Sequence, residues 1–155
     1  MNLVEIERIV NNLIDTFIFS GNVSLDLRNK GLKKKIKSDN TPVTNGDIEV
    51  NNLLINKISN LTPNIKIVSE ENLTNKENKN LKNFWLIDPI DGTYDYINGK
   101  DEFTINAALI LDKKPVAGII NAPDKNRLFY SFGLSKSFEL NNKSKIKLTC
   151  KKKSK

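Results

Sequence analysis

The chain contains WLIDPIDGT at residues 85–93, an apolar run that ends abruptly at two acids, a proline and a glycine. The pattern from Phe84 to Ile87 predicts a strand that is buried on both faces. We therefore expect Asp88 and Asp91 to lie where a rigid core element meets a turn. Hard cations such as Mg2+ prefer carboxylate and carbonyl oxygens, and Pro89 stiffens the turn so that a backbone carbonyl can join the two acids.

Gly92 and Thr93 follow the second acid and offer unhindered backbone N–H groups. If a helix begins there, these groups form a cradle for a phosphate. Asp, Pro and Gly are also common turn residues, so an ordinary strand-end turn with solvated acids is an equally good interpretation of this stretch alone.

Two upstream segments also carry acids beside predicted elements. Ser69-Glu70-Glu71 follows a short apolar strand expected over residues 65–68. Residues 39–47, DNTPVTNGD, precede an amphipathic helix whose apolar side carries Val50, Leu53, Leu54, Ile58 and Leu61. Asp47 falls in the first turn of that helix, where an acid complements the helix dipole. Taken singly, each of these acids is more simply explained as structural than as catalytic.

Taken in order, the three segments resemble the Mg2+-dependent phosphatases of the inositol monophosphatase superfamily. The pattern is an Asp, then Glu-Glu, then Asp-Pro-Ile-Asp-Gly-Thr. Within that superfamily the chain is most similar to the 3'(2'),5'-bisphosphate nucleotidase (CysQ-type) branch, through DNTPVT at 39–44, VSEE at 68–71 and EFTIN at 102–106. The resemblance runs from the first helix to about Leu140. It implies a layered α/β fold of the sugar-phosphatase kind.

The resemblance also implies a two-metal site for phosphate ester hydrolysis. Glu70, Asp88 and the backbone carbonyl of Ile90 would hold one Mg2+, and Asp88 and Asp91 would share a second. One ion in such a site generates hydroxide and the other stabilises the leaving oxygen. Because the chain has no histidine, an imidazole base and a histidine-rich metal site are excluded.

The same resemblance assigns catalytic and substrate contacts. The Thr93 hydroxyl, paired with Asp47, would orient the attacking water and help to deprotonate it. Backbone N–H groups of Gly92 and Thr93 would receive the phosphate oxygens. Glu70, Ile90 and Asp91 would also contact the phosphorylated substrate.

One departure from the family pattern concerns the C-terminal half. Full-length relatives carry a second α/β domain whose Trp-Asp motif supplies a further metal-binding aspartate. This chain reaches Lys155 without that motif, and its only tryptophan, Trp85, already lies in the central strand. We expect residues 1–150 to form an N-terminal metal-binding phosphatase domain that is incomplete relative to the family, followed by a basic tail at 151–155. The expected macromolecular partner is therefore a complementary C-terminal chain or, by self-association, a second copy of this chain.

Bulk composition is typical of a single domain of 155 residues. The net charge is +7, but lysines are spread along the chain without an aromatic-basic module, which argues against a specific nucleic-acid partner. The single cysteine, Cys150, cannot form an internal disulfide. With neither a signal peptide nor a membrane-spanning run in the sequence, we expect a cytoplasmic location.

Hydrophobic spacing predicts an α+β arrangement in which helices cover a largely antiparallel sheet. Leu3, Ile6, Val10, Leu13 and Phe17 predict an N-terminal helix, followed by a polar connection at 29–37 and the helix that begins near Asp47. Later apolar runs predict strands at 103–111, 116–120, 128–132, 138–140 and 146–148. Turn residues at 112–115, 121–124 and 141–142 make these strands antiparallel hairpins.

Three functions remain open from the sequence. The first is a Mg2+-dependent phosphatase that hydrolyses 3'-phosphoadenosine 5'-phosphate to AMP and phosphate. The second is an inositol or sugar monophosphate phosphatase, which would share every metal ligand named above. The third is a non-catalytic fragment of a split gene, either complementing a partner chain or inactive.

Overall fold

The computed structural model describes residues 1–38, 40–72, 81–141 and 144–149. Asp39, Asn142, Cys150 and the expected basic tail at 151–155 lie outside the described residues. Within them, α1 spans Leu3–Lys30, α2 Asn45–Leu61 and the short α3 Thr93–Ile97, with single 3-10 turns η1 at Glu70–Asn72 and η2 at Pro123–Lys125.

Most strands belong to one sheet, in the order β3-β4-β5-β6-β7-β8-β9. Their bounds are β3 Lys66–Ser69, β4 Phe84–Asp91, β5 Thr104–Leu111, β6 Lys114–Ala122, β7 Arg127–Phe132, β8 Ser137–Asn141 and β9 Ser144–Lys147. β3 and β4 are parallel, and every later neighbouring pair is antiparallel. A separate hairpin pairs β1 (Lys34–Ile36) with β2 (Pro42–Thr44). The expected helices-then-meander arrangement and its largely antiparallel sheet are confirmed.

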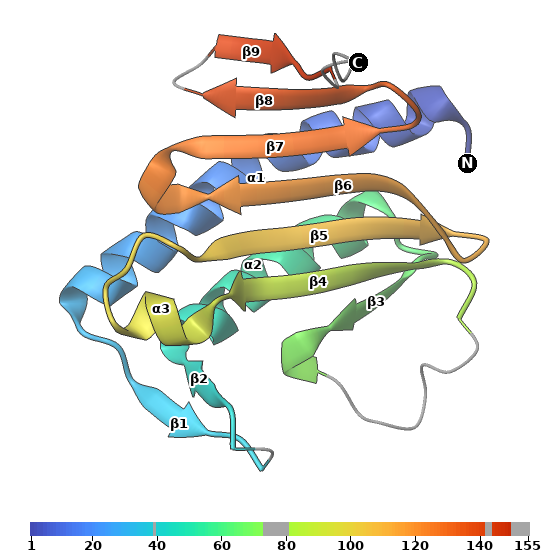
Figure 1. Cartoon of the computed structure of the whole chain (residues 1–155). Helices are drawn as coiled ribbons and strands as arrows, with labels where there is room; N and C mark the ends of the chain where they lie inside the picture. The colour runs from blue at the N-terminus through green and yellow to red at the C-terminus, as the bar shows by residue number, and fades with distance from the viewer. Residues whose placement is uncertain (39, 73–80, 142–143, 150–155) are drawn as a thin grey trace, which may run out of the picture.

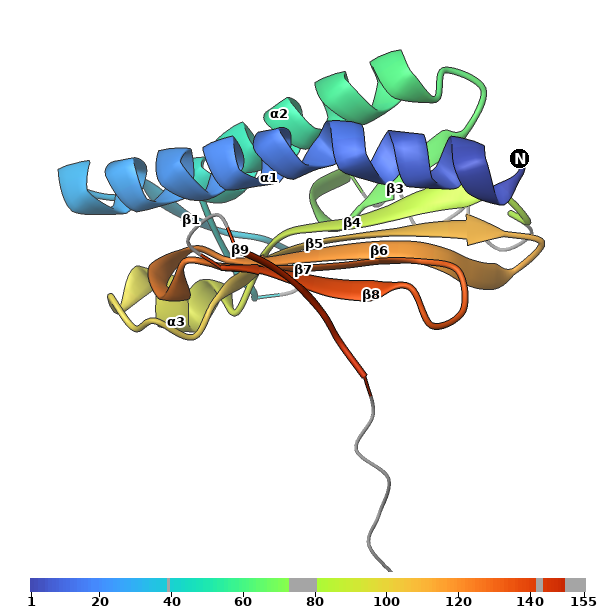
Figure 2. The ribbon, with the colours of Figure 1, turned by 90° about the horizontal axis from the view of Figure 1, so that it is seen from above.

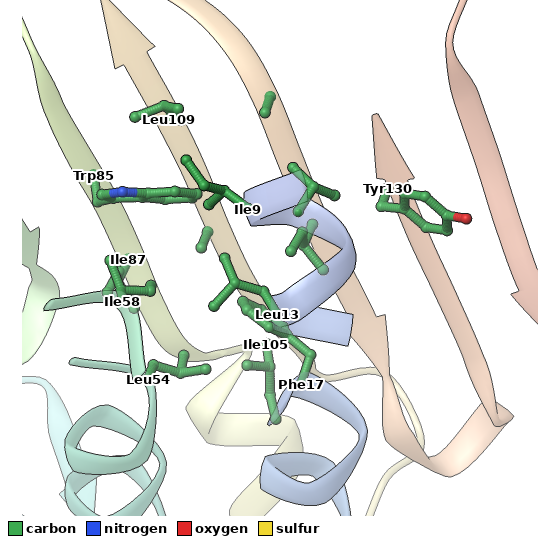
Figure 3. Close-up of a cluster of buried hydrophobic side chains, with 14 of the residues drawn as sticks. Ile9, Leu13, Phe17, Leu54, Ile58, Trp85, Ile87, Ile105, Leu109 and Tyr130 are labelled. Atoms are coloured by element: carbon green, nitrogen blue, oxygen red, sulfur yellow. The ribbon is translucent and has the colours of Figure 1, made fainter. Parts of the chain in front are cut away.

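Helices α1 and α2 lie side by side on one face of the large sheet (Figures 1 and 2). Between these layers is the main core, to which both helices and the central strands contribute (Figure 3). Trp85 is fully buried there and donates from Nε1 to Thr62 Oγ1 at 3.0 Å. The predicted helical stripes are the buried ones: Val10, Leu13 and Phe17 are completely buried in α1.

The opposite face of the large sheet carries apolar side chains that the described residues leave open. Leu86 on β4 and Ile120 on β6 are each 47% exposed, whereas Trp85, Ile87 and Ile119 beside them are buried. The prediction that residues 84–87 are buried on both faces is therefore wrong. The physical reason is that α1 and α2 cover only one side of this part of the sheet (Figure 2).

Three boundary predictions are also wrong. The connection expected at 29–37 begins later and is partly a strand, because α1 continues to Lys30 and residues 34–36 form β1. The C-terminal half of α1 is buried through Ser20, Gly21 and Ser24. These are small residues that hydrophobic periodicity does not detect. The turns at 112–115 and 121–124 are shorter than expected, since residues 114–115 and 121–122 belong to β6.

β4 also continues beyond Ile87 to Asp91, so Asp88 and Asp91 lie within the last residues of the strand rather than in a turn after it. Asp88 pairs with Asn106 and Asp91 with Thr104, and the register shifts between the two acids. An irregularity of this kind accommodates Pro89, which cannot donate to a regular ladder. β4 ends at Asp91, and α3 begins two residues later at Thr93.

In the part of the chain that the structure describes, none of the helices has the length and apolar character required to cross a membrane.

Candidate active site

Four segments that are distant in the sequence meet at one end of the molecule. They are the ends of β3 and β4 and the starts of α2 and α3, with the β1–β2 hairpin beside them (Figure 1). All six residues predicted to bind metal or take part in catalysis lie on these segments: Asp47, Glu70, Asp88, Ile90, Asp91 and Thr93.

Asp47 is held rigidly by the N-terminal cap of α2. Its Oδ2 accepts from the Thr44 backbone N–H at 2.8 Å and from Thr44 Oγ1 at 2.6 Å, and the side chain of Thr44 caps the helix in return. Asp47 is only 1% exposed. Because the cap engages Oδ2, the other oxygen, Oδ1, is directed to Thr93.

Thr93 begins α3 and connects this helix to α2. Its Oγ1 lies 3.3 Å from Asp47 Oδ1 and 3.0 Å from the Ile90 carbonyl oxygen, so its single proton is donated to one of these acceptors at a time. The chain turns into α3 through Gly92, whose φ of 88° favours glycine. An added Cβ at Gly92 would also lie 3.0 Å from the Glu102 carbonyl oxygen. A helix does begin at this position, which is the condition on which the phosphate cradle depends.

Asp88 is the most perturbed acid of the site. Burial, followed by the charges of Glu70, Asp91 and Asp47, raises the pKa of Asp88 to about 7. Its Oδ1 is buried and has no hydrogen-bond partner. Asp91 is more exposed, and its Oδ2 accepts from Asn106 Nδ2 at 3.2 Å. A buried acceptor among several acids is a position that favours a cation.

Lys37, which the sequence analysis did not single out, supplies a positive charge at the end of β3. Its Nζ lies 2.8 Å from Glu71 Oε1 and 3.5 Å from Glu70 Oε1. Burial raises the pKa of Glu71 despite the opposing effect of Lys37. Burial lowers the pKa of Lys37. The hydrogen bond from Lys37 to Glu71 and the charges of both glutamates outweigh this effect, so the pKa of Lys37 is raised overall. Glu71 is thus an internal ion-pair partner and not a plain surface residue.

The turn that carries the two glutamates is anchored to α2. Ser69 Oγ donates to Asn51 Oδ1 at 2.6 Å, and both residues are buried. Asn51 lies one helical turn after Asp47, so α2 positions both the Asp47 carboxylate and the β3 end. Asn51 was also missed, because a polar residue within an amphipathic helix is expected to face solvent.

The residue types fit Mg2+, which takes carboxylate and carbonyl oxygens. Asp88 Oδ1, which has no hydrogen-bond partner, and the Ile90 carbonyl oxygen are ligand atoms of the kind that Mg2+ prefers. Among the described residues, however, no three acids already stand in a metal-binding arrangement. Glu70 lies between Lys37, whose Nζ is 3.5 Å from Glu70 Oε1, and Asp88, whose pKa is raised in part by a hydrogen bond with Glu70.

The fold and the order of the acids define a phosphatase class, and the sequence profile described as "Inositol monophosphatase family" matches residues 11–155. The chain belongs to the inositol monophosphatase family.

Among curated proteins, it is similar to the 3'(2'),5'-bisphosphate nucleotidase CysQ of Haemophilus influenzae, with 37% identity over 127 residues. That match covers 81% of this chain and 47% of the relative. The CysQ protein of Escherichia coli K12 is 38% identical over 94 residues, covering 60% of this chain and 38% of the relative. The chain thus spans about half the length of the curated relatives it matches.

Solved structures agree on the fold. CysQ from Bacteroides thetaiotaomicron matches with a TM-score of 0.72 and 27% identity, covering 91% of this chain and 51% of that one. An inositol monophosphatase from Thermotoga maritima matches with a TM-score of 0.74 and 24% identity, covering 84% of this chain and 50% of that one. A related IMPase/NADP phosphatase, 18% identical with a TM-score of 0.72 and covering 88% and 51%, was solved with Mg2+ and phosphate.

Proposed function

We propose that these residues form a Mg2+-dependent phosphatase site that hydrolyses 3'-phosphoadenosine 5'-phosphate to AMP and phosphate. The observation that carries the proposal is the contact between Thr93 Oγ1 and Asp47 Oδ1, which joins the starts of two helices beside the acids of β3 and β4. The choice of substrate rests on the similarity to CysQ nucleotidases.

In this proposal Mg2+ would be held by Glu70, Asp88, Asp91 and the Ile90 carbonyl, and it would supply an activated water and charge neutralisation at the phosphate. Thr93 Oγ1 accepts a proton from the attacking water while its own proton passes to Asp47 Oδ1. The water oxygen forms a bond to phosphorus and the ester P–O bond breaks. The departing oxygen of the nucleotide takes up a proton from solvent and becomes a hydroxyl group.

The cap of α2 explains why Asp47 can serve as the proton acceptor. Thr44 donates twice to Oδ2, which fixes the carboxylate and leaves Oδ1 facing Thr93. The Gly92 and Thr93 backbone N–H groups, at the start of α3, are proposed to receive the phosphate oxygens together with contacts from Glu70, Ile90 and Asp91.

Residues 1–150 are proposed to act as the metal-binding domain, with weak turnover by the 155-residue chain alone. Phosphate release should be measured with Mg2+ on 3'-phosphoadenosine 5'-phosphate and on inositol monophosphate, with and without the C-terminal half of a CysQ relative. We expect strong release from the nucleotide only when that half is added. Full activity of the chain alone would refute the need for a second half, and a preference for inositol monophosphate would refute the substrate assignment. Failure to release phosphate from either substrate in the presence of both halves would favour a non-catalytic chain.

A further inference from the structure

Asn106, on β5, lies directly opposite Asp88 in the antiparallel pair of β4 and β5. Its neighbours Ile105 and Ala107 are buried on the helix-covered face, so alternation places Asn106 on the open face of the sheet. Opposed residues of this kind have Cβ atoms about 4.5–5.5 Å apart. Asn106 therefore borders the carboxylate cluster from a strand that contributes no acid to it.

The orientation of the Asn106 amide follows from its partner. Nδ2 donates to Asp91 Oδ2 at 3.2 Å, and the reversed amide would place an oxygen against a carboxylate oxygen. The nitrogen must therefore face Asp91. This contact orients one oxygen of Asp91, which lies exposed at the end of β4.

The other amide atom is left without a partner. Asn106 Oδ1 is buried and makes no hydrogen bond, and the same is true of Asp88 Oδ1 on the opposing residue. When Asp88 is ionised both atoms are acceptors and cannot satisfy one another, and a buried acceptor left unpaired costs about 1–3 kcal/mol. A hydrated divalent cation would satisfy both kinds of acceptor, because such an ion takes carboxylate oxygens as ligands and its water can donate a hydrogen bond to an amide oxygen.

We propose that Asn106 is a positioning residue of the metal site: its amide nitrogen orients Asp91, and its amide oxygen completes the acceptor set beside Asp88 for a hydrated Mg2+. This inference rests on the proposed function, since it requires the acids to bind Mg2+. It adds a residue from β5 to a metal site otherwise built from Glu70, which follows β3, and from the end of β4. Residues that orient metal ligands typically change metal affinity by about 10–100-fold when they are replaced.

The test measures Mg2+ affinity by calorimetry and the melting temperature of the metal-free protein. Asn106→Leu removes both polar atoms at similar volume, and Asn106→Ala serves as a second variant because added apolar surface on the open face can promote association. Ser131→Ala is the matched control: Ser131 lies on β7 on the same face, opposite Gly118 and away from the acids. We expect both Asn106 variants to bind Mg2+ about 10-fold or more weakly, with the metal-free melting temperature close to that of the control.

Unchanged Mg2+ affinity in both Asn106 variants would overturn this inference while leaving the proposed metal site intact. A parent chain that binds no Mg2+ would overturn both. A lower metal-free melting temperature with unchanged affinity would identify Asn106 as a purely structural residue.

Discussion

Replacing Asp88 by asparagine should stabilise the metal-free protein while removing its affinity for Mg2+. Asp88 is surrounded by Glu70, Asp91 and Asp47, and its pKa is raised to about 7 by burial and by these charges. Ionised Asp88 is thus unfavourable in the folded chain unless a cation is bound. Asparagine has nearly the same shape as the protonated acid and can donate to Glu70 in its place.

The magnitude follows from the size of the shift. Raising the pKa from 3.8 to about 7 is a shift of about three units, and each unit corresponds to about 1.4 kcal/mol. The full product is an upper limit because the site is open to solvent on one side, which screens the charges. After that discount we expect Asp88→Asn to raise the free energy of unfolding at pH 8 by about 1–2 kcal/mol. For a chain of this size the melting temperature should rise by about 2–8 °C.

The pH dependence has a definite sign. In the unfolded chain Asp88 ionises near its ordinary pKa, whereas in the folded chain it keeps its proton up to about pH 7. Its contribution to stability is therefore fully present below about pH 4 and is lost as the pH rises through 7. The parent and the variant should have similar stability at pH 4, and the variant should be the more stable at pH 8.

The assay is thermal unfolding of both proteins at pH 4 and pH 8, with EDTA and with Mg2+. We expect Mg2+ to raise the melting temperature of the parent and to leave that of Asp88→Asn unchanged. A variant that is less stable than the parent at pH 8 in EDTA would refute the electrostatic reasoning. A Mg2+-dependent rise in the variant would refute the assignment of Asp88 as a central ligand.

Three further outcomes follow from the same geometry. Asp91→Asn should weaken Mg2+ binding less than Asp88→Asn in calorimetry, because only Asp88 is proposed to bridge both ions; equal losses would argue against this role. Thr62→Val should lower the free energy of unfolding in urea by about 1–3 kcal/mol, since it leaves the buried Trp85 indole N–H without its acceptor, and an unchanged midpoint would contradict this. The chain alone should self-associate or bind a hydrophobic dye through the open sheet face around Leu86 and Ile120; a dye-negative monomer would show that this face needs no cover.

The placement of the acids near the starts and ends of elements was predictable from clear changes of pattern, although β4 continues through Asp88 to Asp91. The apolar run before Asp88 and the polar cap before Asp47 both mark such boundaries, and the structure brings them together. The single-sided burial of β4 was not predictable, because a continuous apolar run has the same appearance whether one or both faces are covered. Leu86 shows this most clearly, being apolar and 47% exposed.

The supporting residues of the site carried no distinct sequence signal. Lys37 is one of several lysines in a short segment, and only the β1–β2 hairpin brings its ammonium group to Glu71. Asn106 was visible within EFTIN, but its contact with Asp91 depends on the register between β4 and β5. Register is a tertiary property that local patterns do not fix when both neighbouring strands are apolar.

The most direct test of the central claim is Mg2+-dependent phosphate release from 3'-phosphoadenosine 5'-phosphate by the chain complemented with the C-terminal half of a CysQ relative, measured for the parent and for Thr93→Ala. The proposed site predicts release by the parent, loss of release in EDTA, and a fall of about 100-fold or more in Thr93→Ala. Equal rates for the parent and Thr93→Ala, or release that persists in EDTA, would contradict it.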